Sequence, residues 1–249
     1  MRIIISPAKK MKIDSDTLDY YQLPQFVKET EILLSYLREL SYEEIKNIWN
    51  CNDKIAVLNY ERIRKMDLYR NLTPAILAFE GIQYQYMAPG VFQTDEFAYL
   101  ETHLRILSGF YGILRPFDGV APYRLEMQAR LRGNDLNSLY EFWSGRLAVQ
   151  LLSESRCILN LASREYSKCI SGYLDGNVRF ITCVFGERIG KRVVEKGTQV
   201  KIARGEMVRY MAERQIADVE EIKNFNRLNY AFEEQLSDEN TYTFIKGEK

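Results

Sequence analysis

Basic side chains stand where the sequence predicts that strands end or helices begin. They are Lys9, Arg115, Arg124, Lys168, Lys201, Arg204 and Arg209. Strand ends are common ligand positions in mixed α/β proteins, and arginine offers a planar fork to phosphate oxygens. If these side chains converge, they form a cleft suited to phosphate groups. The alternative is structural pairing, for example between Arg124 and Glu126.

Aromatic and acidic side chains lie beside several of these cations. Tyr111, Tyr123 and Tyr166 are their neighbours in the sequence, and aromatic rings among cations suit the stacking of nucleic-acid bases. The carboxylates available for general acid–base work are Glu80, Asp118, Glu126 and Glu165. Glu126 and Glu165 are the catalytic candidates, because both fall within the clusters at strand ends.

Other familiar kinds of site have no signature in the sequence. There is no P-loop, no dinucleotide-binding glycine fingerprint and no nucleophile elbow. His103 is the only histidine, and the four cysteines show no metal-ligand spacing. We therefore expect no metal site built from histidine and cysteine, and no cofactor. A metal site made only of carboxylate oxygens remains an open alternative.

The stretch from 107 to 127 contains an unusual density of residues that restrict or free the backbone. It holds three glycines, two prolines and the charged residues Arg115, Asp118, Arg124 and Glu126. This composition predicts the end of a strand followed by a long shaped loop. Such loops inside compact domains are more often functional than ordinary connections are.

Buried strand patterns alternate with helical patterns along the rest of the chain. Strands are expected over 3–5, 74–79, 157–162, 178–185, 192–195, 230–232 and 241–244. Helices are expected over 26–40, from Ser41, over 55–66, 94–104, 138–152, from about 163, over 201–214 and over 218–225. The alternation predicts a mixed α/β (α+β) fold in a single domain, 1–249, with a helical subregion at 26–66.

Composition and charge narrow the function only slightly. Lys plus Arg equals Asp plus Glu at 34 each, so the net charge does not favour nucleic acid, although the distribution can be uneven. No run of 18 apolar residues occurs, and the N-terminal apolar run is too short for a secretory signal. We expect a cytoplasmic monomer with reduced cysteines and no membrane span.

Six motifs in order make the sequence similar to the peroxide stress protein family called YaaA, also known as UPF0246 or DUF328. They are Ser6-Pro-Ala-Lys9, Leu107-Ser-Gly-x-Tyr-Gly-x-Leu-Arg-Pro-x-Asp118, Pro122-Tyr-Arg-Leu-Glu-Met127, Leu139-Tyr-x-Phe-Trp143, Asn160-Leu-Ala-Ser-x-Glu-Tyr-Ser167 and Ala203-Arg-Gly-x-Met207. The resemblance spans nearly the whole chain.

The resemblance implies a cytoplasmic protein that limits damage by hydrogen peroxide, through lowering of unincorporated iron and through DNA binding. It also implies a positively charged cleft, containing Lys9, Arg115, Arg124, Lys168 and Arg204, and a helix-hairpin-helix element at 41–66. Two departures stand out. The hairpin turn at 50–53 has asparagines in place of glycine, and Asn229 stands where Gly is expected before Tyr230.

Three hypotheses remain open at this point. The first is a stress protein that binds DNA, as duplex and including damaged or mismatched duplex. The second is an enzyme acting on a nucleobase or nucleotide in the same cleft, with Glu126 or Glu165 in the reaction. The third is an iron-handling protein, against which the shortage of histidine and clustered cysteine speaks.

Overall fold

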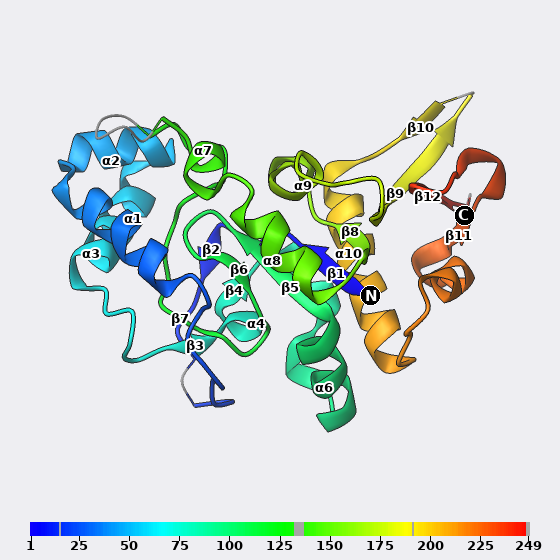
Figure 1. The fold of residues 1–249 in the computed structure, drawn as a ribbon, viewed down its shortest axis with the longest axis horizontal. Helices are drawn as coiled ribbons and strands as arrows, with labels where there is room; N and C mark the ends of the chain where they lie inside the picture. The colour runs from blue at the N-terminus through cyan, green and yellow to red at the C-terminus, as the bar shows by residue number, and fades with distance from the viewer. Residues whose placement is uncertain (15, 132–136, 191, 248–249) are drawn as a thin grey trace.

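A mainly parallel sheet of eight strands forms the centre of the computed structural model, which describes residues 1–14, 16–131, 137–190 and 192–247 (Figure 1). Its strands are β1 (Arg2–Ile5), β5 (Leu104–Ser108), β6 (Gly112–Leu114), β8 (Cys157–Leu161), β9 (Arg179–Ile189), β10 (Arg192–Val194), β11 (Tyr230–Phe232) and β12 (Thr241–Lys246). The order is β11-β12-β9-β8-β1-β5-β6, and β10 pairs with β9 as a hairpin. The predicted mixed α/β fold is confirmed.

The chain leaves β1 and β8 in opposite directions across the sheet. Five neighbouring strands (β12, β9, β8, β1 and β5) are parallel, whereas β6 and β11 pair antiparallel at the two ends of the order. From β1 the chain returns to the sheet at β5, and from β8 it returns on the other side, at β9. The carboxyl ends of β1 and β8 therefore form a topological switch point, where open α/β sheets bind ligands.

The apolar composition of β1 and β8 explains their place at the centre of the sheet. Ile3, Ile4 and Ile5 have no exposed surface, and Ile158 and Leu159 are equally buried. Strands covered on both faces need such continuous apolar runs. The register pairs Ile5 with Leu161, so both strands end at the same level.

Helices pack in two groups around the sheet, and a close backbone contact fixes one of them. Helix α8 (Arg146–Glu154) packs beside α9 (Arg164–Ser171), whereas α10 (Gly197–Glu213) packs against α5 (Ile82–Met87) and α6 (Thr94–His103). A Cβ atom added at Gly205 of α10 would lie 2.1 Å from the carbonyl oxygen of Gln83 in α5. Only glycine permits this approach, which holds α10 against the segment after β4.

Three helices within the 26–66 subregion lie at the end of the molecule opposite β10, β11 and β12 (Figure 1). They are α1 (Val27–Glu39), α2 (Tyr42–Trp49) and α3 (Asp53–Lys65). The capping box predicted at Ser41 is present, with Glu44 as its partner. Asn50 adopts the left-handed conformation (φ 43°), and the Asn52 side chain accepts a hydrogen bond from the Ile55 amide. The asparagines therefore build this turn in place of glycine.

The region from 73 to 91 departs from the sequence prediction. A strand was expected over 74–79, but the chain forms a short helix, α4 (Ala75–Ala78), between the two-residue strands β3 (Thr73–Pro74) and β4 (Phe79–Glu80). The prediction was wrong because a short, fully buried apolar run shows no periodicity that separates strand from helix. Strand β4 pairs with β2 (Lys10–Met11), and β3 pairs with β7 (Gly119–Val120).

Two further predicted helices differ from the prediction. The helix expected over 138–152 is broken between α7 (Leu139–Trp143) and α8, because Ser144 has φ 45°. The expected helix at 218–225 is a 3-10 helix, η2 (Val219–Asn224). Asn229 adopts φ 61°, the left-handed conformation that glycine favours, so the turn before Tyr230 forms without glycine.

The remaining short elements connect the larger ones. They are the 3-10 helices η1 (Pro89–Val91), η3 (Arg227–Asn229) and η4 (Glu234–Leu236). In the part of the chain that the structure describes, none of the helices combines the length and the apolar character needed to cross a bilayer.

Candidate functional site

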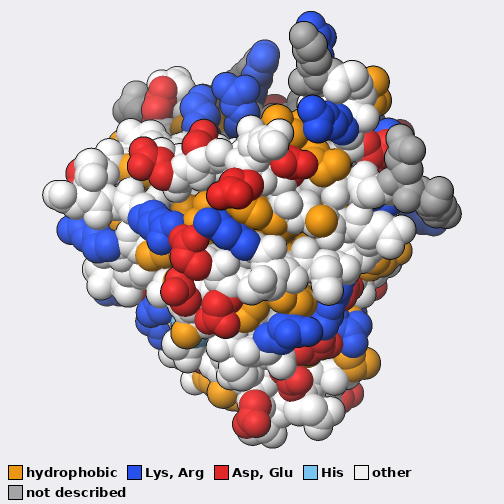
Figure 2. Space-filling view, turned by 90° about the vertical axis from the view of Figure 1, so that its right-hand side faces the viewer, with side chains coloured by type: hydrophobic (Ala, Val, Ile, Leu, Met, Phe, Trp, Pro, Cys, Tyr) orange, Lys and Arg blue, Asp and Glu red, His pale blue; other side chains and the backbone are white. Residues whose placement is uncertain are grey.

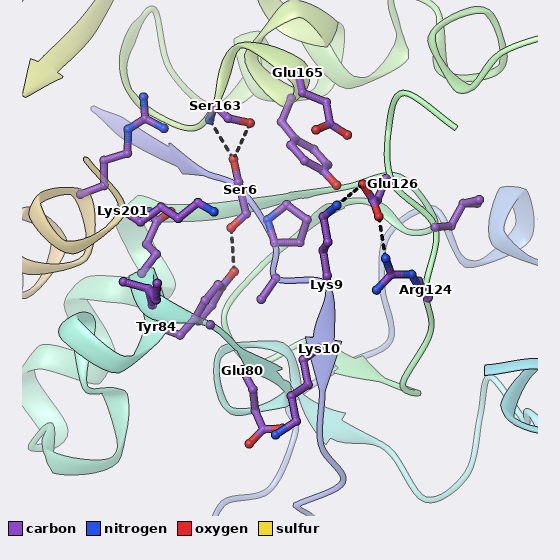
Figure 3. Close-up of a pocket in the computed structure, with 18 of the residues that line it drawn as sticks. Ser6, Lys9, Lys10, Glu80, Tyr84, Arg124, Glu126, Ser163, Glu165 and Lys201 are labelled. Carbon is purple, nitrogen blue, oxygen red and sulfur yellow. Dashed lines mark hydrogen bonds and ion pairs between the residues drawn. The ribbon is translucent and has the colours of Figure 1, made fainter. Parts of the chain in front are cut away.

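A cavity of about 400 Å³ opens at the carboxyl ends of β1 and β8 (Figure 3). We call it cavity A. Its walls come from the segment after β1, the β4–α5 junction, the 123–126 part of the shaped loop, the start of α9, and α10. Its volume lies in the range usual for small-molecule sites, and its position matches the switch point of the sheet.

Two serines join the segments that follow β1 and β8. The Ser163 backbone amide donates to Ser6 Oγ at 2.8 Å, and Ser6 Oγ donates to Ser163 Oγ at 3.2 Å. Tyr84 from α5 donates its hydroxyl to the Ser6 carbonyl oxygen at 3.0 Å. These bonds tie three separate segments together at the cavity wall, which fixes the spacing of the side chains around it.

Glu126 bridges two cations at the cavity. Its Oε2 lies 2.7 Å from Lys9 Nζ, and its Oε1 lies 3.1 Å from Arg124 Nη2. Lys9 keeps 65% of its side chain exposed, whereas Arg124 keeps only 10%. The Nε atom of Arg124 is fully buried and has no hydrogen-bond partner among the residues that the structure describes. The ion pair between Arg124 and Glu126 that the sequence suggested is present. Both residues also line cavity A, so the pair is part of the candidate site.

Glu165 provides a second carboxyl group with a different environment. Burial raises the pKa of Glu165 above its usual value, and the negative charge of Glu126 adds to this effect. The Gln128 backbone amide donates to Glu165 Oε1 at 3.3 Å and opposes the rise. Glu126 forms ion pairs with two cations, whereas burial favours the protonated form of Glu165. Such a division between two carboxyl groups is typical of acid–base pairs.

Tyrosine side chains form the apolar part of the wall. Tyr84, Tyr123 and Tyr166 line the cavity with no more than 7% of their surface exposed, and burial raises the pKa of each phenol. The Tyr123 ring stacks on Phe110 at 5.0 Å, and its hydroxyl is hydrogen-bonded to Ser108 Oγ at 2.6 Å. These phenols are therefore neutral and held in place.

Cations outnumber carboxylates around cavity A. The cations are Lys9, Lys10, Arg124, Lys201 and Arg204, and the carboxylates are Glu80, Glu126 and Glu165. Lys10 pairs with Glu80 at 3.0 Å. The formal excess of two positive charges suits an anionic ligand. The excess is local, because the chain as a whole has a formal net charge of zero. Figure 2 shows basic and acidic side chains interleaved over the face that it presents.

The structure brings together most of the residues that the sequence selected. The candidates lining cavity A are Lys9, Tyr123, Arg124, Glu126, Glu165, Lys201 and Arg204. Arg115, Lys168 and Arg209 are not among its lining residues. Arg115 donates to the Gln22 side chain at 2.9 Å, Lys168 lies over the Tyr140 ring at 4.8 Å, and Arg209 pairs with Glu213 at 2.7 Å. Each of these three cations therefore has a structural partner away from cavity A.

Ser6, Ser163 and Tyr84 were not selected from the sequence as site residues. Ser6 and Ser163 each follow a buried strand within a quoted motif, which was the available signal. His103 lies away from the cavity, with Nδ1 3.0 Å from the Met1 carbonyl oxygen. Among the described residues, no group of three or more His, Cys, Asp or Glu side chains is arranged to hold a metal ion.

Comparison with known proteins agrees with the motif pattern. Residues 1–236 match the family described as peroxide stress protein YaaA. A UPF0246 protein of Lachnoclostridium phytofermentans is 57% identical, with 100% of this chain and 97% of that protein covered. UPF0246 proteins of Desulfitobacterium hafniense and Pediococcus pentosaceus are 55% and 49% identical, over 99% and 100% of this chain and 98% and 99% of theirs. The chain belongs to the YaaA family of peroxide stress proteins, the UPF0246 group.

Proposed function

We propose that this peroxide stress protein binds DNA at cavity A, with phosphate groups on the surrounding cations and a base within the cavity. The observation that carries the proposal is the local excess of positive charge around a pocket of about 400 Å³ with apolar aromatic walls. Cations supply affinity for the phosphate backbone, and a pocket of this size accommodates an unstacked base. Damaged or mismatched duplex is the favoured form, because its bases leave the stack at lower cost.

The exposed cations Lys9 and Lys201 provide the sharpest test. We expect duplex DNA binding to weaken as salt rises, with an apparent slope that becomes shallower by about 1 when one phosphate contact is removed. Lys9→Ala and Lys201→Ala are each expected to show this loss. The measurement is fluorescence anisotropy of matched and mismatched duplexes across a salt series.

Two cations outside the cavity serve as matched controls for this experiment. Lys168→Ala and Arg209→Ala remove the same charge from α9 and α10, respectively, at positions that do not line cavity A. They should retain the binding and salt slope of the parent. Equal losses in all four variants would indicate general surface charge and reject the proposal, as would the absence of salt-dependent binding in the parent.

A second candidate function is catalysis on a nucleobase or nucleotide in the same cavity. Two carboxyl groups with different surroundings favour it. Glu126 forms ion pairs with Lys9 and Arg124, whereas burial raises the pKa of Glu165. In this proposal Glu165 donates a proton and Glu126 stabilises positive charge that develops on the substrate. Glu165→Gln should retain ligand binding and lose product formation. No turnover by the parent on a broad panel of nucleosides, nucleotides and oligonucleotides would remove this candidate.

Lowering of unincorporated iron stays a prediction that rests on the family resemblance. The side chains around cavity A are mainly cationic and suit an anion better than a ferrous or ferric ion. The test is retention of iron by the purified protein after anaerobic desalting. Retained stoichiometric iron would favour direct binding, whereas loss of the iron would leave any effect on iron indirect.

A further inference from the structure

A second cavity adjoins cavity A behind a shared wall. This cavity, which we call cavity B, measures about 710 Å³ and is lined by residues from β8, β9, α9, α10 and the start of β12. Ser163, Lys201 and Arg204 line both cavities. These three side chains therefore form the boundary between the two cavities.

The guanidinium of Arg204 lacks the hydrogen-bond partners that a buried Nε normally has. Within the described ranges its guanidinium makes no hydrogen bond or ion pair, and its Nε is fully buried; the charge of Glu195 attracts it without forming an ion pair. Burial lowers the pKa of its guanidinium. Arg209, five residues later on the same helix, illustrates the usual arrangement, because it pairs with Glu213. A guanidinium whose Nε is buried without a partner is costly for a folded protein, which points to an anionic partner from outside the chain.

The surroundings of Arg204 in cavity B suit a phosphate group. Arg164, Lys201 and Arg204 line cavity B together with a single carboxylate, Glu195, so positive charge exceeds negative charge by two. Neutral side chains that can donate hydrogen bonds also line the cavity, namely Asn160, Ser167, Ser171, Thr182, Asn240 and Thr241. Cys183 is buried against the same space, and burial raises the pKa of its thiol, so it adds no negative charge.

The N-termini of two helices add to the preference of cavity B for an anion. Residues of the first turn of α9 and of α10 line cavity B, and neither helix has a side-chain cap at its N-terminus. Uncapped first-turn amides and the positive end of the helix dipole favour negative charge.

From these observations we infer that cavity B is a phosphate-binding subsite and that Arg204 is its central ligand, at the junction with cavity A. The inference rests on the proposed function in one respect, since it assigns the base to cavity A and the attached phosphate to cavity B. Two sources present this chemistry: the terminal phosphomonoester of a nucleotide or strand end, and an internal phosphodiester of DNA. Both offer oxygens to the guanidinium fork.

The first experiment uses inorganic phosphate alone, titrated into the full-length protein by calorimetry at constant ionic strength with chloride as the balancing anion. The parent is expected to bind phosphate. Arg204→Gln should weaken this binding by about tenfold or more, the effect of losing charge-assisted hydrogen bonds. Arg209→Gln, the matched control, should bind as the parent does. Equal binding by all three proteins, equal loss in both variants, or no binding by the parent would each overturn the inference.

A stability measurement keeps the experiment interpretable if Arg204→Gln behaves unexpectedly. Removal of an unpaired buried charge should leave the unfolding midpoint unchanged or raise it, whereas added phosphate should raise the midpoint of the parent and not that of Arg204→Gln. A variant with a lowered midpoint and no phosphate effect on the parent would show that Arg204 serves the fold, and would overturn the inference.

Oligonucleotides separate the two sources of phosphate. Single strands of one sequence with and without a 5′-phosphate are compared by competition against labelled DNA. Tighter binding of the phosphorylated strand, lost in Arg204→Gln, assigns a terminal monoester; equal binding of both, weakened in Arg204→Gln, assigns an internal diester. Phosphate binding without DNA binding would reject the proposed function and retain the phosphate site, so the two failures are distinguishable.

Discussion

The same arrangement of charges occurs at both ends of the central sheet, with different surroundings. At the amino ends of β1 and β5, Glu154 bridges Arg2 and Arg105, each at 2.7 Å. At the carboxyl end of β1, Glu126 bridges Lys9 and Arg124. Arg105 is 5% exposed and also bonds two backbone carbonyl oxygens, whereas Lys9 is 65% exposed.

This difference separates a structural cluster from a candidate site. Glu154 also accepts a hydrogen bond from Gln150, and its interactions with Arg2 and Arg105 keep its pKa below the usual value despite burial. It lines neither cavity. Glu126 lies in the wall of cavity A, beside a second carboxyl group. Ion pairing alone therefore does not mark a candidate site in this protein; position at the switch point of the sheet distinguishes Glu126 from Glu154.

The largest expected effect is on stability, at the structural cluster. Glu154→Ala leaves Arg105 buried without its carboxylate, and the free energy of unfolding should fall by about 3–5 kcal/mol, as measured by urea denaturation. Glu126→Ala, the equivalent change at cavity A, should cost less, because only Arg124 of its two cations is buried and Lys9 remains hydrated. Equal losses in the two variants would remove the distinction between the clusters.

The buried carboxyl group of Asp118 gives the next effect. Burial raises the pKa of Asp118 to about 7, although its side chain accepts a hydrogen bond from the Arg115 amide at 2.8 Å. Because the folded-state pKa exceeds the unfolded value, Asp118 stabilises the fold at low pH. This contribution should decline, by a few kcal/mol, as pH rises from about 4 through 7. Asp118→Asn should lack this decline relative to the parent in denaturation at several pH values. Parallel profiles would contradict the assignment.

A smaller effect on stability and a clearer one on binding are expected for Glu126→Gln. The change removes negative charge between Lys9 and Arg124 while retaining shape, so the free energy of unfolding should change by less than about 1 kcal/mol. DNA affinity at low salt should rise a few-fold, because the two cations are released for phosphate. A loss of affinity similar to that of Lys9→Ala would show that Glu126 positions the cations instead.

The smallest effect is expected at the turn between α2 and α3. Asn50 already adopts the left-handed conformation, so Asn50→Gly should change the free energy of unfolding by less than about 0.5 kcal/mol. DNA affinity should remain that of the parent if cavity A is the main site. A marked gain in affinity would assign the dominant phosphate contact to the α2–α3 turn.

Local sequence patterns predicted much of the fold. The buried runs at 3–5 and 157–162 became the two central strands, and the capping box at Ser41 formed as expected. The segment at 74–79 failed because its burial is set by tertiary contacts: the Ala75 amide donates to the Asp118 carbonyl oxygen, and the Ile76 amide donates to that of Pro116. Contacts so distant in sequence leave no local pattern.

The sequence predicted which residue types form the candidate site, but only some of the residues it selected line cavity A. Strand ends were identified, but strand direction was not. Arg115 follows β6, which is antiparallel to β5, so it lies towards the amino ends of the parallel strands. Arg209 lies five residues beyond Arg204 on α10, about 140° around the helix. The sequence alone did not place these two side chains away from cavity A.

The most direct test of the account is hydrogen–deuterium exchange of the parent protein with and without mismatched duplex DNA. The account predicts slower exchange in four of the segments that build cavity A, namely 6–10, 80–84, 123–126 and 163–166. The α1–α3 helices should exchange as they do in the free protein. Protection confined to the α2–α3 turn, or no protection in the four cavity segments under saturating DNA, would contradict the claim that DNA binds at the carboxyl ends of β1 and β8.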